Sequence, residues 1–141
     1  MRCETLDEKE FKTIVKKMSK VGSFKDLIVY QKAYRLAMEI FELSKRFPKA
    51  ETYSLTDQIC RSSRSVTSCI AESWAKRKYE KAFVNKLTDS LGEEYETEGW
   101  LDYSLDCKYI DDEIHKKLML EYEEVRRILI SMINNPDKWC Y

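Results

Sequence analysis

The stretch VYQKAYRLAMEIFELSKRFP, residues 29–48, decides the predicted fold. Its apolar residues recur at alternating steps of four and three, and they are Val29, Ala33, Leu36, Ile40, Leu43 and Phe47. This spacing is typical of a helix that packs one face against a nearly antiparallel neighbour. Pro48 ends the helix, because the residue before a proline is displaced from helical backbone angles. We predict that the helix starts near Asp26, with Ser23 as its N-cap.

Three further long helices are predicted after Pro48, over about residues 52–77, about residues 79–108, and from Asp111 or Asp112 to a stop at Asn134-Asn135-Pro136. The inner face of the second comprises Leu55, Ile59, Ser63, Val66, Ile70 and Trp74. The inner face of the third comprises Phe83, Leu87, Leu91, Tyr95, Leu101 and Leu105. The inner face of the fourth comprises Ile114, Leu118, Tyr122, Val125, Leu129 and Met132. Long helices with short links predict an all-α fold, an antiparallel up-down-up-down four-helix bundle over residues 23–135.

Two groups of small residues interrupt the predicted helices. The second helix carries Ser62, Ser63, Ser65, Thr67 and Ser68, which are poor helix formers and would let a neighbouring helix approach closely. The third helix contains Gly92 and Gly99, each of which costs about 1 kcal/mol relative to alanine. We interpret these glycines as marks of close approach by another helix or another chain.

The ends of the chain lie outside the predicted bundle. Residues 1–22 form an N-terminal extension, either mobile or a short amphipathic helix that carries Phe11, Ile14, Val15 and Met18 and ends near Gly22. Residues 136–141 form a short aromatic tail. We find neither a secretory signal nor an apolar run of membrane-spanning length, so we expect a cytoplasmic protein without membrane contact.

The sequence favours binding over catalysis. His115 is the single histidine of the chain, and it follows Asp112 by three residues. A di-iron bundle needs two carboxylate-x-x-His motifs, so one histidine cannot complete it. Five cysteines without a CxxC pair predict reduced thiols, with Cys69 packed as a small apolar residue. We therefore expect no catalytic residue, no metal, no cofactor and no small-molecule substrate.

Charge is unevenly distributed although the net charge is zero. The candidates for contacting RNA or DNA are the basic residues in and after the second helix: Arg61, Arg64, Lys76, Arg77, Lys78 and Lys81. Lysine and arginine neutralise phosphates, and Trp74 or Tyr79 could stack on a base. The alternative for these residues is an ordinary solvated helix face.

Residues 87–113 carry ten acidic side chains and one basic side chain. In a head-to-tail ring, the acidic surface of one copy could face the basic surface of the next copy, which would set the register of assembly. The candidates for this subunit interface are Gln58, Glu72, Glu94, Glu98 and Asp102.

Four ordered segments also carry a family resemblance: DLIVYQKA at 26–33, Phe47-Pro48, ETYSLTDQI at 51–59 and SVTSCIAE at 65–72. They resemble the bacterial four-helix bundle proteins encoded by intervening sequences in large-subunit (23S) ribosomal RNA genes. That family includes the accessory variability determinant proteins of diversity-generating retroelements. The resemblance implies a small bundle that assembles into a ring, typically a pentamer. A surface shared with the family would involve Gln58, Arg61, Arg64, Glu72, Arg77 and Lys78.

Two functions follow as hypotheses. The first is a non-enzymatic, homo-oligomeric interaction protein that binds RNA or DNA through its basic second helix. The alternative is a structural or accessory subunit that binds another protein, such as a reverse transcriptase, without nucleic-acid contact. In the second case the N-terminal helix and the tail residues Trp139 and Tyr141 would supply the contacts.

Overall fold

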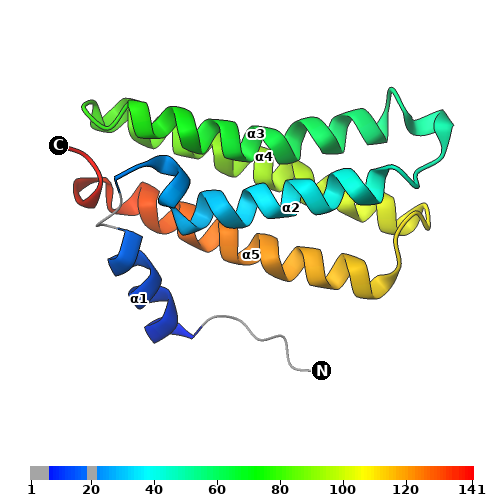
Figure 1. The fold of residues 1–141 in the computed structure, drawn as a ribbon, viewed down its shortest axis with the longest axis horizontal. Helices are drawn as coiled ribbons and strands as arrows, with labels where there is room; N and C mark the ends of the chain where they lie inside the picture. The colour runs from blue at the N-terminus through cyan, green and yellow to red at the C-terminus, as the bar shows by residue number, and fades with distance from the viewer. Residues whose placement is uncertain (1–6, 19–21) are drawn as a thin grey trace.

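The computed structural model describes residues 7–18 and 22–141, and the described residues form helices and turns without a β-strand (Figure 1). The all-helical class is therefore confirmed. The α-helices are α1 (Glu8–Met18), α2 (Ile28–Ser44), α3 (Leu55–Ala75), α4 (Glu80–Asp106) and α5 (Asp112–Asn134). Short 3₁₀ turns occupy Phe24–Asp26, Lys49–Glu51 and Pro136–Lys138.

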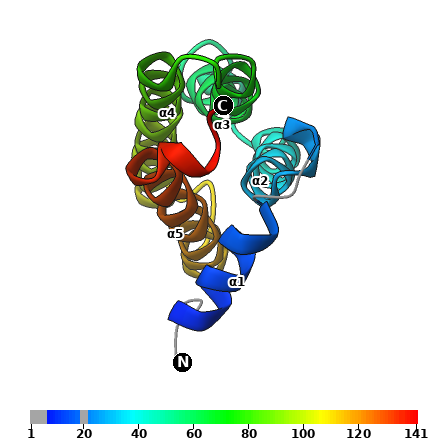
Figure 2. The same cartoon turned by 90° about the vertical axis from the view of Figure 1, so that its left-hand side faces the viewer.

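The four long helices lie side by side, and each packs against the next, with α5 returning to α2 (Figures 1 and 2). Two ion pairs between α2 and α5 show that these helices run in opposite directions. Lys32 Nζ lies 2.7 Å from Glu124 Oε2, and Lys117 Nζ lies 3.5 Å from Glu39 Oε1, so residue numbers rise along one helix as they fall along the other. The short helix α1 stands apart from this group in both views, with Phe11 and Ile14 half-buried against the core.

The first long helix is shorter than predicted at both ends. Ser23 does not cap α2, because its Oγ accepts from the backbone N of Lys25 (3.3 Å) and caps the 3₁₀ turn before it. The helix starts at Ile28, after the buried Leu27, and ends at Ser44. Beyond Ser44 the backbone tightens, since the N of Phe47 donates to the carbonyl of Ser44 (3.1 Å) before Pro48 stops the chain. The predicted stripe is fully buried up to Ile40, and its last two members are half-buried.

The other helix boundaries differ from the predictions by a few residues. Residues 49–51 form a 3₁₀ turn, which delays the start of α3 from residue 52 to Leu55. The helix α3 ends at Ala75, and α4 covers Glu80–Asp106 within the predicted range 79–108. The prediction for α5 is confirmed at its start, where Asp111 Oδ1 accepts from the backbone N of Ile114 (2.8 Å) as an N-cap.

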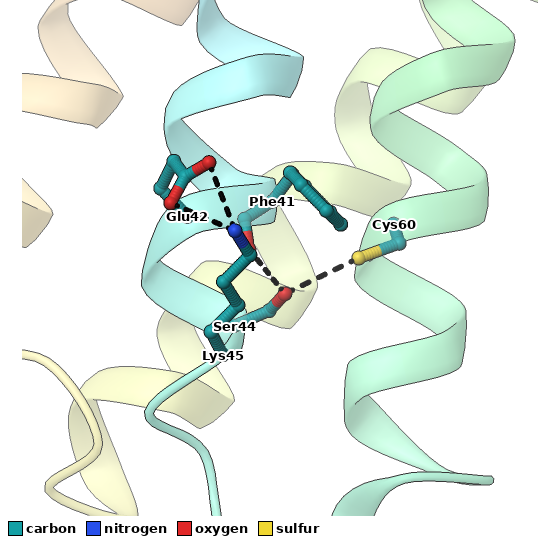
Figure 3. A network of polar contacts seen from close by, with 5 residues as sticks. All are labelled: Phe41, Glu42, Ser44, Lys45 and Cys60. Atoms are coloured by element: carbon teal, nitrogen blue, oxygen red, sulfur yellow. Dashed lines mark hydrogen bonds and ion pairs between the residues drawn. The ribbon is translucent and has the colours of Figure 1, made fainter.

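The contact between α2 and α3 joins the last turn of α2 to the first half of α3 (Figure 3). Ser44 Oγ donates to the carbonyl oxygen of Phe41 (2.7 Å) and lies 3.5 Å from Cys60 Sγ. The Phe41 ring carries two cations, with Lys45 Nζ 4.7 Å and the Arg64 guanidinium carbon 5.4 Å from its centroid. Lys45 Nζ also lies 3.1 Å from Glu42 Oε2, so one of the two cations beside this ring has a carboxylate partner.

The buried face of α4 is more polar than predicted. Tyr95 is 52% exposed, so this member of the predicted stripe was wrong, whereas Leu91 and Leu105 are half-buried and pack against the core. The residues fully buried between Leu87 and Leu105 are Ser90, Glu94, Thr97, Leu101 and Ser104.

Small side chains on both helices let α3 and α4 pack closely, as the serines of α3 predict. Ser90 Oγ reaches the backbone of α3 and donates to the carbonyl of Val66 (2.8 Å). Thr97 Oγ1 lies 2.9 Å from Ser62 Oγ, and both residues are buried. Hydroxyl groups with partners can replace apolar side chains here because their hydrogen bonds offset the cost of burial.

Three further expectations are decided by burial. Cys69 is buried between α3 and α4, as predicted, and burial raises the pKa of its thiol. Trp139, expected as an exposed contact residue, is only 5% exposed and packs against the core. Gly92 and Gly99 do not mark close approach by another described helix, since a Cβ at either position would have nothing within 4 Å. The side chains of Val15 and Met18 lie outside the described part of the chain.

No helix within residues 7–18 and 22–141 combines the length and the apolar character that a membrane span requires.

The burial of Trp139 yields a stability prediction. We expect Trp139→Ala to lower the free energy of unfolding by about 3 kcal/mol, because it removes a large buried aromatic side chain and leaves a cavity. Tyr141→Ala is the matched control, since that ring is 82% exposed and its loss should change stability by less than about 0.5 kcal/mol. Urea unfolding followed by circular dichroism measures both, and equal effects would contradict the role of Trp139 as a core residue.

Candidate nucleic-acid and subunit interfaces

The predicted basic residues fall into two separate groups. Lys76, Arg77, Lys78 and Lys81 lie together around the turn from α3 to α4. Arg61 and Arg64 lie at least twelve residues earlier on α3, which is about 18 Å along the helix axis. The two groups therefore belong to different parts of the surface, one at an end of the bundle and the other along its side.

Arg77 is held in place at the α3–α4 turn. Its guanidinium carbon lies 3.6 Å from the Trp74 ring centroid and 5.2 Å from the Tyr141 ring centroid. Arg77 Nε donates to the carbonyl of Trp74 (2.9 Å), and the backbone N of Tyr141 donates to the carbonyl of Arg77 (3.4 Å). An arginine stacked on aromatic faces keeps its charge and loses little further conformational freedom on binding an anion.

The lysines around Arg77 are exposed. Lys76, Lys78 and Lys81 all point charge into solvent, and Lys78 Nζ lies 5.9 Å from the Tyr79 ring. The rings of Tyr79 and Tyr141 are 64% and 82% exposed, so they offer open aromatic faces beside these cations. Cations next to open rings have the chemistry that single-stranded nucleic acid requires, with phosphates for the cations and bases for the rings.

Arg61 and Arg64 have partners within the chain. Arg61 Nε lies 2.9 Å from Asp57 Oδ2, one turn earlier on the exposed surface of α3. Arg64 lies over the Phe41 ring. Both side chains stay exposed. Lys45 nearby is paired with Glu42 (3.1 Å), so two of the three cations on the α2–α3 side have a carboxylate partner.

The predicted subunit-interface residues have different environments. Gln58 is exposed. Glu72 pairs with Lys86 (2.7 Å) and Asp102 with His115 (2.8 Å), and each of these two carboxylates is more than half exposed. Glu98 pairs with Arg126 (3.0 Å) and is only 14% exposed. Glu94 is fully buried, so the expectation that it lies at an interface was wrong, since a side chain inside the bundle cannot reach a second copy.

Glu94 is the most perturbed acid of the described chain. Neither carboxyl oxygen has a hydrogen-bond partner, and the fully buried hydroxyl of Tyr122 also lacks one. Burial raises the pKa of Glu94 to about 9, and the neighbouring Glu98 carboxylate adds to the increase while Arg126 opposes it. Burial and the Glu94 charge likewise raise the pKa of Tyr122. Glu94 is consequently a neutral acid at physiological pH, which removes most of the cost of burying it.

One open groove lies between α2 and α5, with a volume of about 390 Å³. Met38, Leu43, Ile114 and Leu118 form its apolar floor, and charged residues of both helices form its rim. The groove could not be predicted from the sequence, because it depends on how far the neighbouring helices α2 and α5 separate. Within the described residues, no three His, Cys, Asp or Glu side chains gather closely enough to hold a metal ion.

Residues 25–131 match the sequence profile of the 23S rRNA-intervening sequence protein family. The chain belongs to this family. The resemblance stated from four short segments is thereby confirmed, and the match extends beyond them to residue 131. Curated protein sequences contain no significant match to this intervening sequence protein.

A solved structure supports the same assignment. It is a Bacteroides thetaiotaomicron protein of unknown function that belongs to the S23 ribosomal protein family, and it is 30% identical to this chain. The TM-score is 0.69, and the match covers 78% of this intervening sequence protein and 98% of the other chain. The helical fold is thus shared by a relative that is itself without an established activity.

The buried Glu94 gives a pH prediction. Its folded pKa exceeds its unfolded value, so the folded state is penalised progressively as pH rises from about 4.5 towards about 9, by up to about 1.4 kcal/mol per pH unit. Glu94→Gln cannot ionise, and its free energy of unfolding should therefore exceed that of the wild type by a growing margin from pH 5 to pH 8.

Urea titrations of both proteins at several pH values test this expectation. Asp106→Asn is the control, because Asp106 is an exposed acid on the same helix, more than three turns beyond Glu94, and its replacement should leave the pH dependence of stability nearly unchanged. A constant difference between Glu94→Gln and the wild type across this pH range would show that Glu94 does not remain protonated in the folded protein.

Proposed function

We propose that this intervening sequence protein is a non-enzymatic interaction protein whose unit, an antiparallel four-helix bundle, assembles with copies of itself. The observation that supports assembly is the opposite charge of two sides of the molecule. The exposed face of α4 carries Asp89, Glu96, Asp102 and Asp106. The α2–α3 side carries exposed Arg64, together with Lys45 paired with Glu42 and Arg61 paired with Asp57. The helices α4 and α2 lie on opposite sides of the bundle when it is viewed from its end (Figure 2).

Opposite charge on opposite sides favours a head-to-tail arrangement. Each copy can present its acidic side to the basic side of the next copy, and such contacts close into a ring when the rotation between copies permits. A pentamer is the ring size that the family resemblance implies. Complementary charge contributes mainly to the choice and register of partners, so the contact should depend on salt concentration.

Sedimentation at micromolar concentration and low salt tests the assembly. We expect a mass several times the 16.8 kDa of one chain, and a weaker association as salt rises. Arg61→Glu with Arg64→Glu should shift the protein towards the monomer, because like charges then face each other. Lys116→Glu, at an exposed site on α5, is the control and should keep the wild-type mass. A monomeric wild type in low salt would contradict the proposal.

RNA or DNA binding is the second candidate function, and the Arg77 cluster favours it. Lys76, Lys78 and Lys81 surround an arginine already ordered by two aromatic rings, at an end of the bundle that is separate from the acidic side. In a ring, these ends would repeat around one rim, so weak contacts of single copies would add up along one strand.

Fluorescence anisotropy with a labelled single-stranded RNA measures this activity. We expect the triple variant Lys76→Ala, Lys78→Ala and Lys81→Ala to bind more weakly. The slope of log K against log salt should become shallower by about 2, since each lost phosphate contact on a single strand removes about 0.7. Lys116→Ala serves as the control for a lost exposed lysine. Binding that is equal in the triple variant and the wild type would rule out the α3–α4 turn as the site.

A further inference from the structure

Residues 136–141 form a strap that crosses the end of the bundle from α5 towards α3 (Figure 2). The buried Trp139 anchors this strap in the core. Two residues further on, the backbone N of Tyr141 donates to the carbonyl of Arg77 (3.4 Å), and the Tyr141 ring centroid lies 5.2 Å from the Arg77 guanidinium carbon. The strap therefore joins the end of α5 to the turn between α3 and α4.

Arg77 makes more contacts than the end of a helix requires. Its Nε donates to the carbonyl of Trp74 (2.9 Å), and its guanidinium carbon lies 3.6 Å from the Trp74 ring centroid. Stabilising the C-terminus of α3 accounts for these two contacts, because a cation near the last carbonyls of a helix is favourable. It does not account for the second ring, which the strap brings from the far end of α5 to the same guanidinium.

The cations at this end of the bundle are not neutralised by the chain itself. Residues 76–81 and 136–141 together carry five cations and two acids. Among residues 7–18 and 22–141, no carboxylate pairs with Arg77 or with the exposed lysines beside it, which are Lys76, Lys78, Lys81 and Lys138. Within the same residues, the two terminal nitrogens of Arg77 donate no hydrogen bond, because only Nε has an acceptor.

This arrangement has the chemistry of a phosphate receptor. A guanidinium whose two terminal nitrogens keep their N–H groups can donate to two oxygens of one phosphate. Rings that already contact the guanidinium reduce the conformational freedom that it would lose on binding. The surrounding lysines can contact the neighbouring phosphates of the same strand.

We propose that the strap makes Arg77 the phosphate receptor of the α3–α4 turn. Trp139 anchors the strap, and Tyr141 holds the guanidinium so that its terminal N–H groups face a phosphate of single-stranded RNA. This inference rests on the RNA binding proposed above as the second candidate function. It assigns Tyr141 as a positioning residue that acts through Arg77, although 63 residues separate the two in the sequence.

A double-mutant cycle on the affinity for a labelled single-stranded RNA tests the strap. Tyr141→Ala should weaken binding about fivefold in the wild-type background, because the guanidinium loses a ring that orients it. In the Arg77→Ala background the same change should weaken binding less than about twofold. Tyr79→Ala is the control, since that exposed ring lies beside Lys78 rather than Arg77, and its effect should be equal in both backgrounds.

Tyr141→Phe provides the second measurement. It keeps a ring over Arg77 and should bind the RNA as tightly as the wild type, so the ring rather than the hydroxyl is tested. If the wild type does not bind the RNA, the proposed binding function itself fails. If the wild type binds and Tyr141→Ala binds equally well, binding stands and the role of the strap is wrong. An equal loss from Tyr141→Ala in both backgrounds would overturn its action through Arg77.

Discussion

The side chain of Ser90 on α4 donates to the backbone carbonyl of Val66 on α3, and the rest of the molecule depends on the closeness that this bond requires. A hydroxyl on so short a side chain reaches a neighbouring backbone only when the two helices almost touch. The pair Thr97 and Ser62 repeats the contact two turns along α4. Small residues must therefore line this seam. Among the helices, α5 supplies the most large apolar side chains to the core. Once the small residues of α4 face α3, the remaining residues of α4 must face α5 or outward.

The same constraint places Glu94 where no water reaches it. Its carboxyl lies between the hydroxyl-lined seam and Tyr122, and the ionised form would have to be stabilised by a buried partner that the seam does not provide. Glu98, one turn further along, is paired with Arg126 and leaves Glu94 to remain protonated. A polar layer of this kind favours one register of the four helices, because a shifted α4 would separate Ser90 and Thr97 from their acceptors.

The sequence predicts the burial of a residue correctly when local spacing along one helix determines it. It fails when the packing between helices determines it. The stripe from Val29 to Ile40, the cap at Asp111 and the helical class follow from local spacing, and they agree with the structure. The position of Glu94 does not, since leucine and tyrosine are the residues that periodicity assigns to a core, and only the narrow α3–α4 seam turns Tyr95 outward and Glu94 inward. The burial of Trp139 likewise depends on a turn after Pro136 that brings the last residues back to the bundle end.

The charge of the candidate surfaces was also predicted only in part. The composition of residues 87–113 correctly indicates a negative helix, but it cannot separate exposed carboxylates such as Glu96 from those satisfied inside the chain, such as Glu98. For the glycines, the sequence leaves two explanations, a neighbouring helix or a neighbouring chain, and the empty space at both Cβ positions removes the first. The exposed acidic residues of α4 lie on the side of the molecule away from α2, and the proposed self-assembly rests on this uneven distribution of charge.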